Sequence, residues 1–175
     1  MAPLGPLKGK NFGTSISPWV ISFDALEPFR AAAPSQTQPI QDYLKTPPLP
    51  TYDIQMRAEI HVNDTVTVIC ESQLQSLHWT LSQAIAHLTS GGCGLRTGDL
   101  VATGTVSGPL SGQHGCLLES TSGGQKPIVL KDGSERRYLH DGDVVLISAV
   151  AGGHNSGVGF GECLAQIYPS KSAPS

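Results

Sequence analysis

The chain has 175 residues, a length that suits a single domain. Its formal net charge is −3 and its 11 lysine and arginine residues are scattered along the chain, which argues against nucleic acid as a partner because no basic stripe is available for a phosphate backbone. The sequence has no signal segment and no apolar run of the ~18 residues that would cross a membrane, so we expect a cytoplasmic protein with no membrane partner.

The N-terminal third is rich in glycine and proline. Residues 1–19 are too interrupted for a long helix and predict ordered loop with short strand. A short strand is expected at residues 19–23, followed by one helical turn at Asp24–Glu27 with Asp24 as its cap. Residues 31–51 carry prolines among polar residues, which predicts an exposed connecting loop.

A β-hairpin is predicted in the middle of the chain. Apolar and polar residues alternate from Tyr52 to Val62, which is typical of a half-buried strand. Asn63-Asp64 suits a turn, and residues 65–70 are β-rich enough to form the returning strand. His61 falls on the polar face, where we expect a solvated side chain rather than a metal ligand.

One amphipathic helix is predicted at residues 72–89, because leucine, isoleucine and alanine recur at spacings of three and four. Ser90-Gly91-Gly92 is expected to end it. His78 and His87 are nine residues apart and point in nearly opposite directions on such a helix, which argues against a shared metal ion.

The remaining residues predict further strands. These are expected at residues 100–106, 115–120, 128–130, 137–139, 144–150 and 158–168, with Asp132-Gly133 as a hairpin turn and residues 171–175 as a frayed tail. Roughly eight strands and one helix give a mainly β (α+β) fold, arranged as a β-roll or barrel rather than an alternating α/β sheet.

Four cysteines are present with no CxxC spacing, which argues against a zinc clip and a redox pair. We expect reduced, mostly buried thiols, although spacing alone leaves open a pair that meets in the fold. The cysteines are Cys70, Cys93, Cys116 and Cys163.

Residues 3–20 carry the most specific motif, Pro-Leu-Gly-Pro-Leu-Lys-Gly-Lys-Asn-Phe-Gly-Thr-Ser-Ile-Ser-Pro-Trp-Val. This run resembles the Pro-Leu-Gly-Pro-Phe-x-Gly-Lys-Ser-Phe-Gly-Thr-x-x-Ser-Pro-Trp-Val stretch of the fumarylacetoacetase family. Further matches follow in order at residues 24–29, 95–100, 104–109, 118–119, 141–143 and 159–161. The resemblance implies a fumarylacetoacetase-like β-roll, of which residues 1–175 would be the C-terminal part of the catalytic domain, truncated on its N-terminal side.

The resemblance also implies an activity. Members of this family hydrolyse a carbon–carbon bond of 4-fumarylacetoacetate to give fumarate and acetoacetate, the last step of tyrosine and phenylalanine catabolism. A divalent ion, Mg²⁺ or Ca²⁺, chelates the diketone and polarises the carbonyl that water attacks. A homodimer is the family's assembly.

Four residues of this chain match functional positions of the family. Lys10 would lie beside the metal and stabilise the leaving group, and Thr14 would belong to the same metal-site loop. Thr105 would bind substrate, and Glu119 would hold the histidine that acts as general base. Without the resemblance, we would interpret Thr105 as a turn residue and Glu119 as an exposed acid. We expect Asp99, Asp141 and Asp143 to be structural, since each adjoins a glycine in a turn.

The family's histidine base and metal carboxylates lie upstream of the motif at residues 3–20, and no position of this sequence matches them. His114 lies five residues from Glu119 but has no counterpart role. Because lysine and threonine are poor ligands for a hard dication, we expect weak metal binding by this chain alone. Two alternatives remain: a catalytically dead fragment that serves as a binding or assembly module, and a related diketone hydrolase or decarboxylase. A phosphate loop around Lys10 is disfavoured because the Walker spacing is missing.

Overall fold

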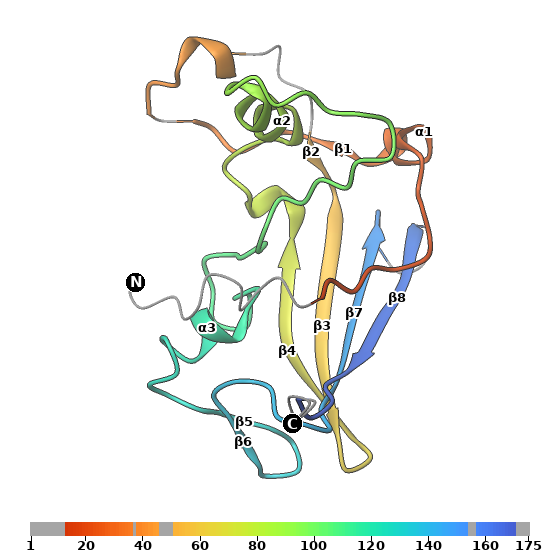
Figure 1. Cartoon of the computed structure of the whole chain (residues 1–175), viewed down its shortest axis with the longest axis vertical. Coiled ribbons are helices and arrows are strands. Elements are labelled where there is room, and N and C mark those ends of the chain that lie inside the picture. Colours follow the sequence, from red (N-terminus) through yellow and green to blue (C-terminus); the bar gives the residue numbers. More distant parts are fainter. Residues whose placement is uncertain (1–12, 37, 46–50, 154–156, 171–175) are drawn as a thin grey trace, which may run out of the picture.

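A four-stranded antiparallel sheet is the centre of the molecule in this computed structural model, which describes residues 13–36, 38–45, 51–153 and 157–170. The strands are β3 (Ile54–Val62), β4 (Thr65–Gln73), β7 (Val144–Ala151) and β8 (Val158–Gln166), in the order β4-β3-β7-β8 (Figure 1). β4 and β8 are therefore the edges of this sheet. The mainly β fold class is confirmed.

The predicted hairpin is confirmed as β3 and β4. Val62 pairs with Thr65, and Asn63 and Asp64 both have positive φ angles, 48° and 59°, as a two-residue hairpin turn with left-handed central residues requires. Ile54 and Ile60 of β3 are buried, in agreement with the alternation. His61 is half-exposed and contacts Glu59 through Nε2 at 3.0 Å.

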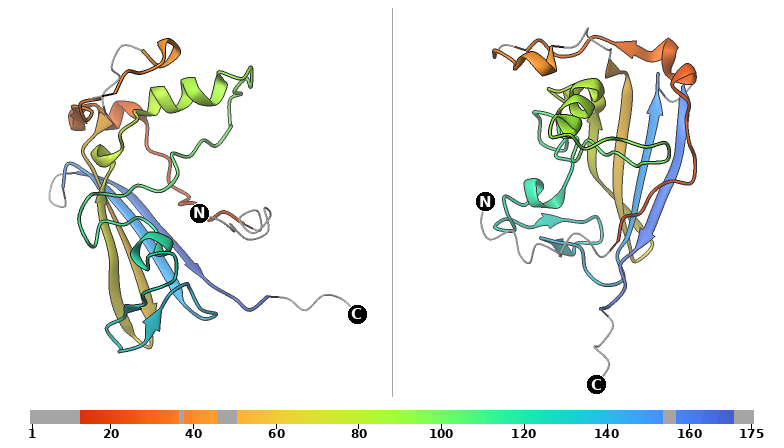
Figure 2. Two further views of the ribbon diagram at one scale, coloured as in Figure 1. Left: turned by 90° about the vertical axis from the view of Figure 1, so that its left-hand side faces the viewer. Right: turned by 45° about the horizontal axis from the view of Figure 1, so that its top comes forward.

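A small hydrophobic core lies at one end of the sheet. Its buried members are Leu26, Tyr52, Ile54, Leu74 and Ala151. These residues come from α1 (Phe23–Leu26), β2 (Thr51–Tyr52), β3, η4 (Leu74–Ser76) and β7, so the segments before and after the hairpin meet over its end. Figure 2 shows α1 and α2 (Leu81–Thr89) at this end of the sheet.

The N-terminal segment differs from the prediction. No strand forms at residues 19–23; α1 starts at Phe23 because Ser22, rather than Asp24, is its N-cap and accepts from the Ala25 amide. η2 (Glu27–Phe29) follows, and β1 (Arg30–Ala31) pairs with β2. Within residues 31–51, the described part contains η3 (Asp42–Leu44).

The helix is shorter than predicted. α2 spans Leu81–Thr89, and its start is fixed by a capping box in which Thr80 Oγ1 accepts from the Gln83 amide while Gln83 Oε1 accepts from the Thr80 amide. Ser72 and Gln73 belong to β4 instead. Leu74 fits the helical spacing of apolar residues because it packs on the core, but it does so from η4 rather than from α2. The helix ends at Ser90 as predicted.

Of the strands predicted after the helix, three are wrong. Residues 100–106 form an irregular connection in which residues 100–105 are exposed, Leu100 being 71% exposed, and residues 115–120 contain instead the helical turn α3 (Leu117–Ser120). The Asp132-Gly133 hairpin is confirmed, with β5 (Ile128–Val129) as its first strand, but its second strand is β6 (Glu135–Arg136) and residues 137–139 are not in a strand. α3 and this hairpin lie beside β4 (Figure 1).

The cysteines are all free, and only Cys70 of the four is buried, so the expectation of mostly buried thiols is wrong. Within the described ranges, no helix is both long and apolar enough to cross a membrane. The tail at residues 171–175 lies outside the described residues.

Candidate functional site

The four residues that the sequence singled out are placed to different extents. Lys10 lies outside the described residues. Thr14, Thr105 and Glu119 are described, and all three are exposed to solvent. A hydrogen bond from Ser107 to Glu119 joins the segments that carry Thr105 and Glu119, whereas Thr14 lies on a different segment.

Glu119 is carried by α3, a single helical turn that depends on the residue after it. Thr121 is fully buried, and its Oγ1 donates to the Leu117 carbonyl at 2.6 Å and accepts from the Gly124 amide at 2.9 Å. Both bonds tie the end of α3 to the turn that follows. Glu119 therefore lies on a short helical turn that these two hydrogen bonds stabilise. The sequence pattern predicts a strand here instead.

Ser107 is the residue of this site that sequence reasoning missed as a functional candidate. Its Oγ donates a hydrogen bond to Glu119 Oε2 at 2.5 Å and accepts one from the Gly115 amide at 3.1 Å. The Gly104–Pro109 motif contained this serine, but spacing alone gave no reason to connect it with a residue twelve positions later.

Close packing completes the loop between residues 105 and 119. A Cβ added to Gly115 would lie 2.5 Å from the Val106 carbonyl oxygen and 2.7 Å from Thr105 Cγ2, so only glycine fits against this backbone. The Gly108 amide donates to the Gln113 carbonyl at 2.9 Å. Thr105 and Glu119 thus stand on the two arms of one closed loop.

This loop also contacts the edge of the central sheet. The Glu71 amide of β4 donates to the Gly112 carbonyl at 2.8 Å. Burial raises the pKa of the Cys70 thiol, opposed by a hydrogen bond with Ser72, and the nearby charge of Glu119 raises it further. The loop and α3 are therefore held against β4.

The motif at residues 13–19 is attached to the opposite edge. Ser17 Oγ donates to the Phe160 carbonyl of β8 at 3.0 Å. Gly161 has a φ of +72°, and a Cβ there would lie 2.2 Å from Trp19 Cδ1, so the indole packs directly on this glycine. Figure 1 shows the segment crossing a face of the sheet before it reaches α1. Thr14 precedes this attachment by three residues.

Two of the three aspartates expected to be structural, Asp99 and Asp143, form hydrogen bonds within their turns or with a neighbouring arginine. Asp143 is buried and receives two hydrogen bonds of 2.9 Å from Arg136, as well as one from the His140 amide. Burial opposes its ionisation, but the Arg136 hydrogen bonds prevail and hold the pKa of Asp143 below its ordinary value. Asp99 accepts from the Arg96 amide at 2.8 Å.

The described residues do not by themselves fit a hard dication. No group of three or more histidine, cysteine, aspartate and glutamate side chains gathers among them. Thr14 offers one neutral oxygen, whereas Mg²⁺ and Ca²⁺ take about six to eight oxygen ligands, usually including carboxylates.

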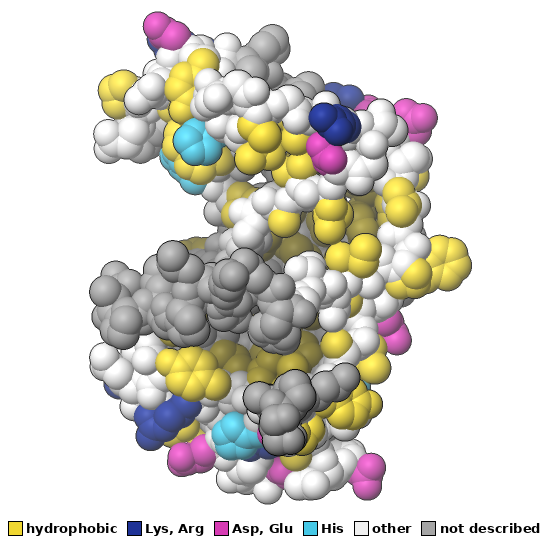
Figure 3. Space-filling view, in the orientation of Figure 1, with side chains coloured by type: hydrophobic (Ala, Val, Ile, Leu, Met, Phe, Trp, Pro, Cys, Tyr) yellow, Lys and Arg dark blue, Asp and Glu magenta, His cyan; other side chains and the backbone are white. Residues whose placement is uncertain are grey.

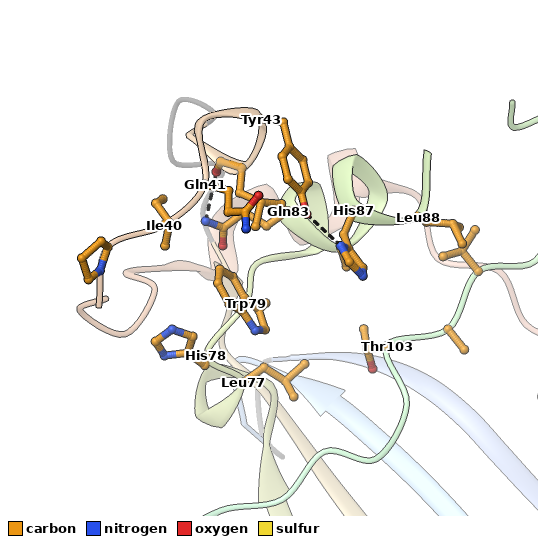
Figure 4. A pocket seen from close by; sticks show the side chains of 15 residues that line it. Ile40, Gln41, Tyr43, Leu77, His78, Trp79, Gln83, His87, Leu88 and Thr103 are labelled. Carbon is orange, nitrogen blue, oxygen red and sulfur yellow. Dashed lines mark hydrogen bonds between the residues drawn. The ribbon is translucent and has the colours of Figure 1, made fainter. Parts of the chain in front are cut away.

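A cavity in the described part lies away from these residues. It measures about 610 Å³ and is bounded by η3, α2, residues 77–79 and residues 101–103. Figure 4 shows Trp79 facing into it, with Tyr43 Oη hydrogen-bonded to His87 Nδ1 at 3.1 Å. In the space-filling view of Figure 3, an indentation lies just below the end of the molecule that carries α2. Neither Thr105 nor Glu119 lines the cavity.

Comparison with known proteins gives a consistent result. A family model described as "Fumarylacetoacetate (FAA) hydrolase C-terminal" matches residues 1–167. The chain is 48% identical over 170 residues to a protein named fumarylacetoacetase from Arabidopsis thaliana, covering 96% of this chain and 40% of the relative. It is 39% identical over 170 residues to the Homo sapiens protein of that name, covering 96% of this chain and 41% of the relative. The chain thus spans about 40% of the length of these curated relatives.

Proposed function

The chain belongs to the fumarylacetoacetate hydrolase family, and on this basis we propose that residues 1–175 form the C-terminal part of the catalytic domain of a fumarylacetoacetase. The observation that carries the proposal beyond similarity is the closed loop that joins Thr105 to Glu119 through Ser107. Residues that the resemblance assigns to substrate and to the catalytic base are thereby joined in one structural unit.

The proposed reaction is hydrolysis of 4-fumarylacetoacetate. Water adds to a carbonyl of the diketone, the adjacent carbon–carbon bond breaks, and the carbon that leaves takes a proton, so that fumarate and acetoacetate are formed. The proposal places the protein in tyrosine and phenylalanine catabolism, in the cytoplasm and in a homodimer. Its partner is the small-molecule substrate, with neither nucleic acid nor membrane involved.

Each matched residue has a proposed role. Glu119 accepts a hydrogen bond from the ring N–H of the histidine base and so keeps the other ring nitrogen free to take a proton from water. Ser107 occupies Oε2, which leaves Oε1 for the histidine as far as the described residues are concerned. Thr105 donates its hydroxyl to substrate, and the Lys10 ammonium offsets charge that develops on the leaving group.

The metal is proposed for the complete enzyme. Mg²⁺ or Ca²⁺ would supply Lewis-acid polarisation of the substrate carbonyl, with Thr14 and Lys10 near it. Since the described residues lack a fitting ligand set, the carboxylates would come from the part of the relatives that this chain does not span.

A chimeric enzyme tests the proposal. This chain would replace the matching C-terminal segment of the Arabidopsis relative, and consumption of 4-fumarylacetoacetate would be followed with Mg²⁺ present. We expect turnover and formation of fumarate. A chimera that folds, binds Mg²⁺ and leaves the substrate intact would contradict the proposed function.

A further inference from the structure

The Ser107 hydroxyl has two partners of opposite kind. It accepts the Gly115 amide proton at 3.1 Å and lies 2.5 Å from Glu119 Oε2. A serine hydroxyl has a single proton, and the backbone amide can only donate. The amide therefore takes a lone pair, and the hydroxyl proton is directed at the carboxylate.

We propose that Ser107 is a positioning residue that fixes the orientation of the Glu119 carboxylate before any histidine or substrate binds to it. The inference rests on the proposed function, because the value of the orientation depends on the role of Glu119 in catalysis. It goes beyond that function in assigning a role to a residue that the family resemblance did not single out.

Glu119 needs such a restraint because its surroundings provide little packing. The side chain is exposed, and the helix that carries it has only four residues. Fixing a glutamate side chain costs rotamer entropy, so a free carboxylate would sample several orientations. A hydrogen bond from a hydroxyl to a carboxylate is charge-assisted, and such bonds are about twice as strong as neutral ones.

The donor is itself held in place. Gly115 packs on the Val106 carbonyl group and the Thr105 side chain without room for a side chain of its own, which fixes the amide that orients the Ser107 hydroxyl. The packed backbone thus fixes the Gly115 amide, the amide orients the Ser107 hydroxyl, and the hydroxyl orients the Glu119 carboxylate.

The alternative to positioning Glu119 is that Ser107 holds the loop closed, and the two roles predict different results. The loop has other ties: the Gly108 amide bonds the Gln113 carbonyl, and the Glu71 amide bonds the Gly112 carbonyl. Both bonds should survive Ser107→Ala. If Ser107 positions Glu119, the variant should free the carboxylate while the loop remains closed.

The test is NMR on the isotopically labelled 175-residue chain. The side-chain couplings of Glu119 report whether it occupies one rotamer or several, and hydrogen exchange at Gly108 and Glu71 reports whether the loop is closed. For Ser107→Ala we expect averaged Glu119 couplings, about tenfold faster exchange of the Gly115 amide, and unchanged exchange at Gly108 and Glu71. Ser107→Thr, which keeps the hydroxyl, should restore the single rotamer. Ser111→Ala, in the same loop, should change none of these.

Two results would overturn the proposal. One is a single Glu119 rotamer that persists in Ser107→Ala. The other is rotamer averaging accompanied by faster exchange at Gly108 and Glu71, which would give Ser107 a loop-closing role. The result does not depend on turnover, so an inactive chimera would refute the proposed function and leave the Ser107 test intact.

Discussion

Ser17 Oγ donates a hydrogen bond of 3.0 Å to the Phe160 carbonyl, across 143 positions of sequence. This bond joins two motifs that the sequence showed only as separate matches to one family. Beside it, Trp19 packs on Gly161. The long N-terminal motif is therefore held on β8 at the point where a glycine makes room for an indole ring.

Gly161→Ala tests this attachment. The new Cβ would collide with Trp19 and would sit at a φ of +72°, a region that side chains other than glycine rarely adopt. We expect the free energy of unfolding to fall by about 1–3 kcal/mol, measured by urea unfolding. Gly159→Ala is the matched control on the same strand, since no atom lies within 4 Å of its added Cβ. Equal stability of the two variants would contradict the packing.

Gly115→Ala should disturb the site rather than the sheet. Its Cβ would lie 2.5 Å from the Val106 carbonyl oxygen, so the backbone that presents its amide to Ser107 must move. In the chimeric enzyme we expect kcat to fall about tenfold or more, as is usual when positioning is lost. Gly94→Ala, in the same connection but with open space around it, should retain full activity. The idea fails if both variants are equally active.

Asp143→Asn should be strongly destabilising. It leaves the buried Arg136 guanidinium without its charge partner, a change that typically costs about 3–5 kcal/mol. Asp42→Asn is the control, because that carboxylate is 95% exposed and its pairing with Lys45 contributes less than ~1 kcal/mol. Chemical unfolding at neutral pH measures both. Similar losses in the two variants would show that the buried pair has no special weight.

The same pair gives a pH dependence. The fold lowers the pKa of Asp143, so the stability that its ionised form contributes is present above the unfolded pKa of about 3.9 and is lost as the pH falls through the lower folded pKa. The difference in unfolding free energy between wild type and Asp143→Asn should therefore shrink on acidification below about pH 4. A constant difference would contradict this linkage.

Thr80→Ala should weaken the start of α2. Thr80 Oγ1 accepts from the Gln83 amide, and loss of such an N-cap typically costs about 1 kcal/mol. Thr89→Ala at the other end removes a hydroxyl that only bonds back to the Ile85 and Ala86 carbonyls, and should cost less. Thermal unfolding of the two variants compares them directly, and a larger loss in Thr89→Ala would be the opposing result.

Strong local patterns predicted the central sheet well. The alternation from Tyr52 to Val62 and the Asn63-Asp64 turn are both properties of neighbouring residues, and both are found in the structure. β7 and β8 were also predicted from short apolar runs. The helix start was missed because Leu74 and Leu77 continue its spacing while packing on the core from η4 and the residue after it.

The site was less accessible to sequence reasoning. The β-rich apolar run of residues 115–120 predicts a strand and gives no sign of the buried Thr121 hydroxyl that ends a helical turn there. The role of Ser107 depends on a loop that returns to itself, and the bond between Ser17 and Phe160 depends on the whole fold. Such long-range contacts leave no periodic signal in the chain.

The most direct test of the central claim is kcat of the chimeric enzyme carrying Glu119→Gln, beside a Glu135→Gln control. Both glutamates are exposed, and Glu135 belongs to β6, outside the loop that joins Thr105 to Glu119. We expect Glu119→Gln to lower kcat on 4-fumarylacetoacetate by about a hundredfold or more, since support of a general base is lost, with Glu135→Gln unchanged. Equal turnover of the two variants would contradict the claim that this chain supplies part of the catalytic site.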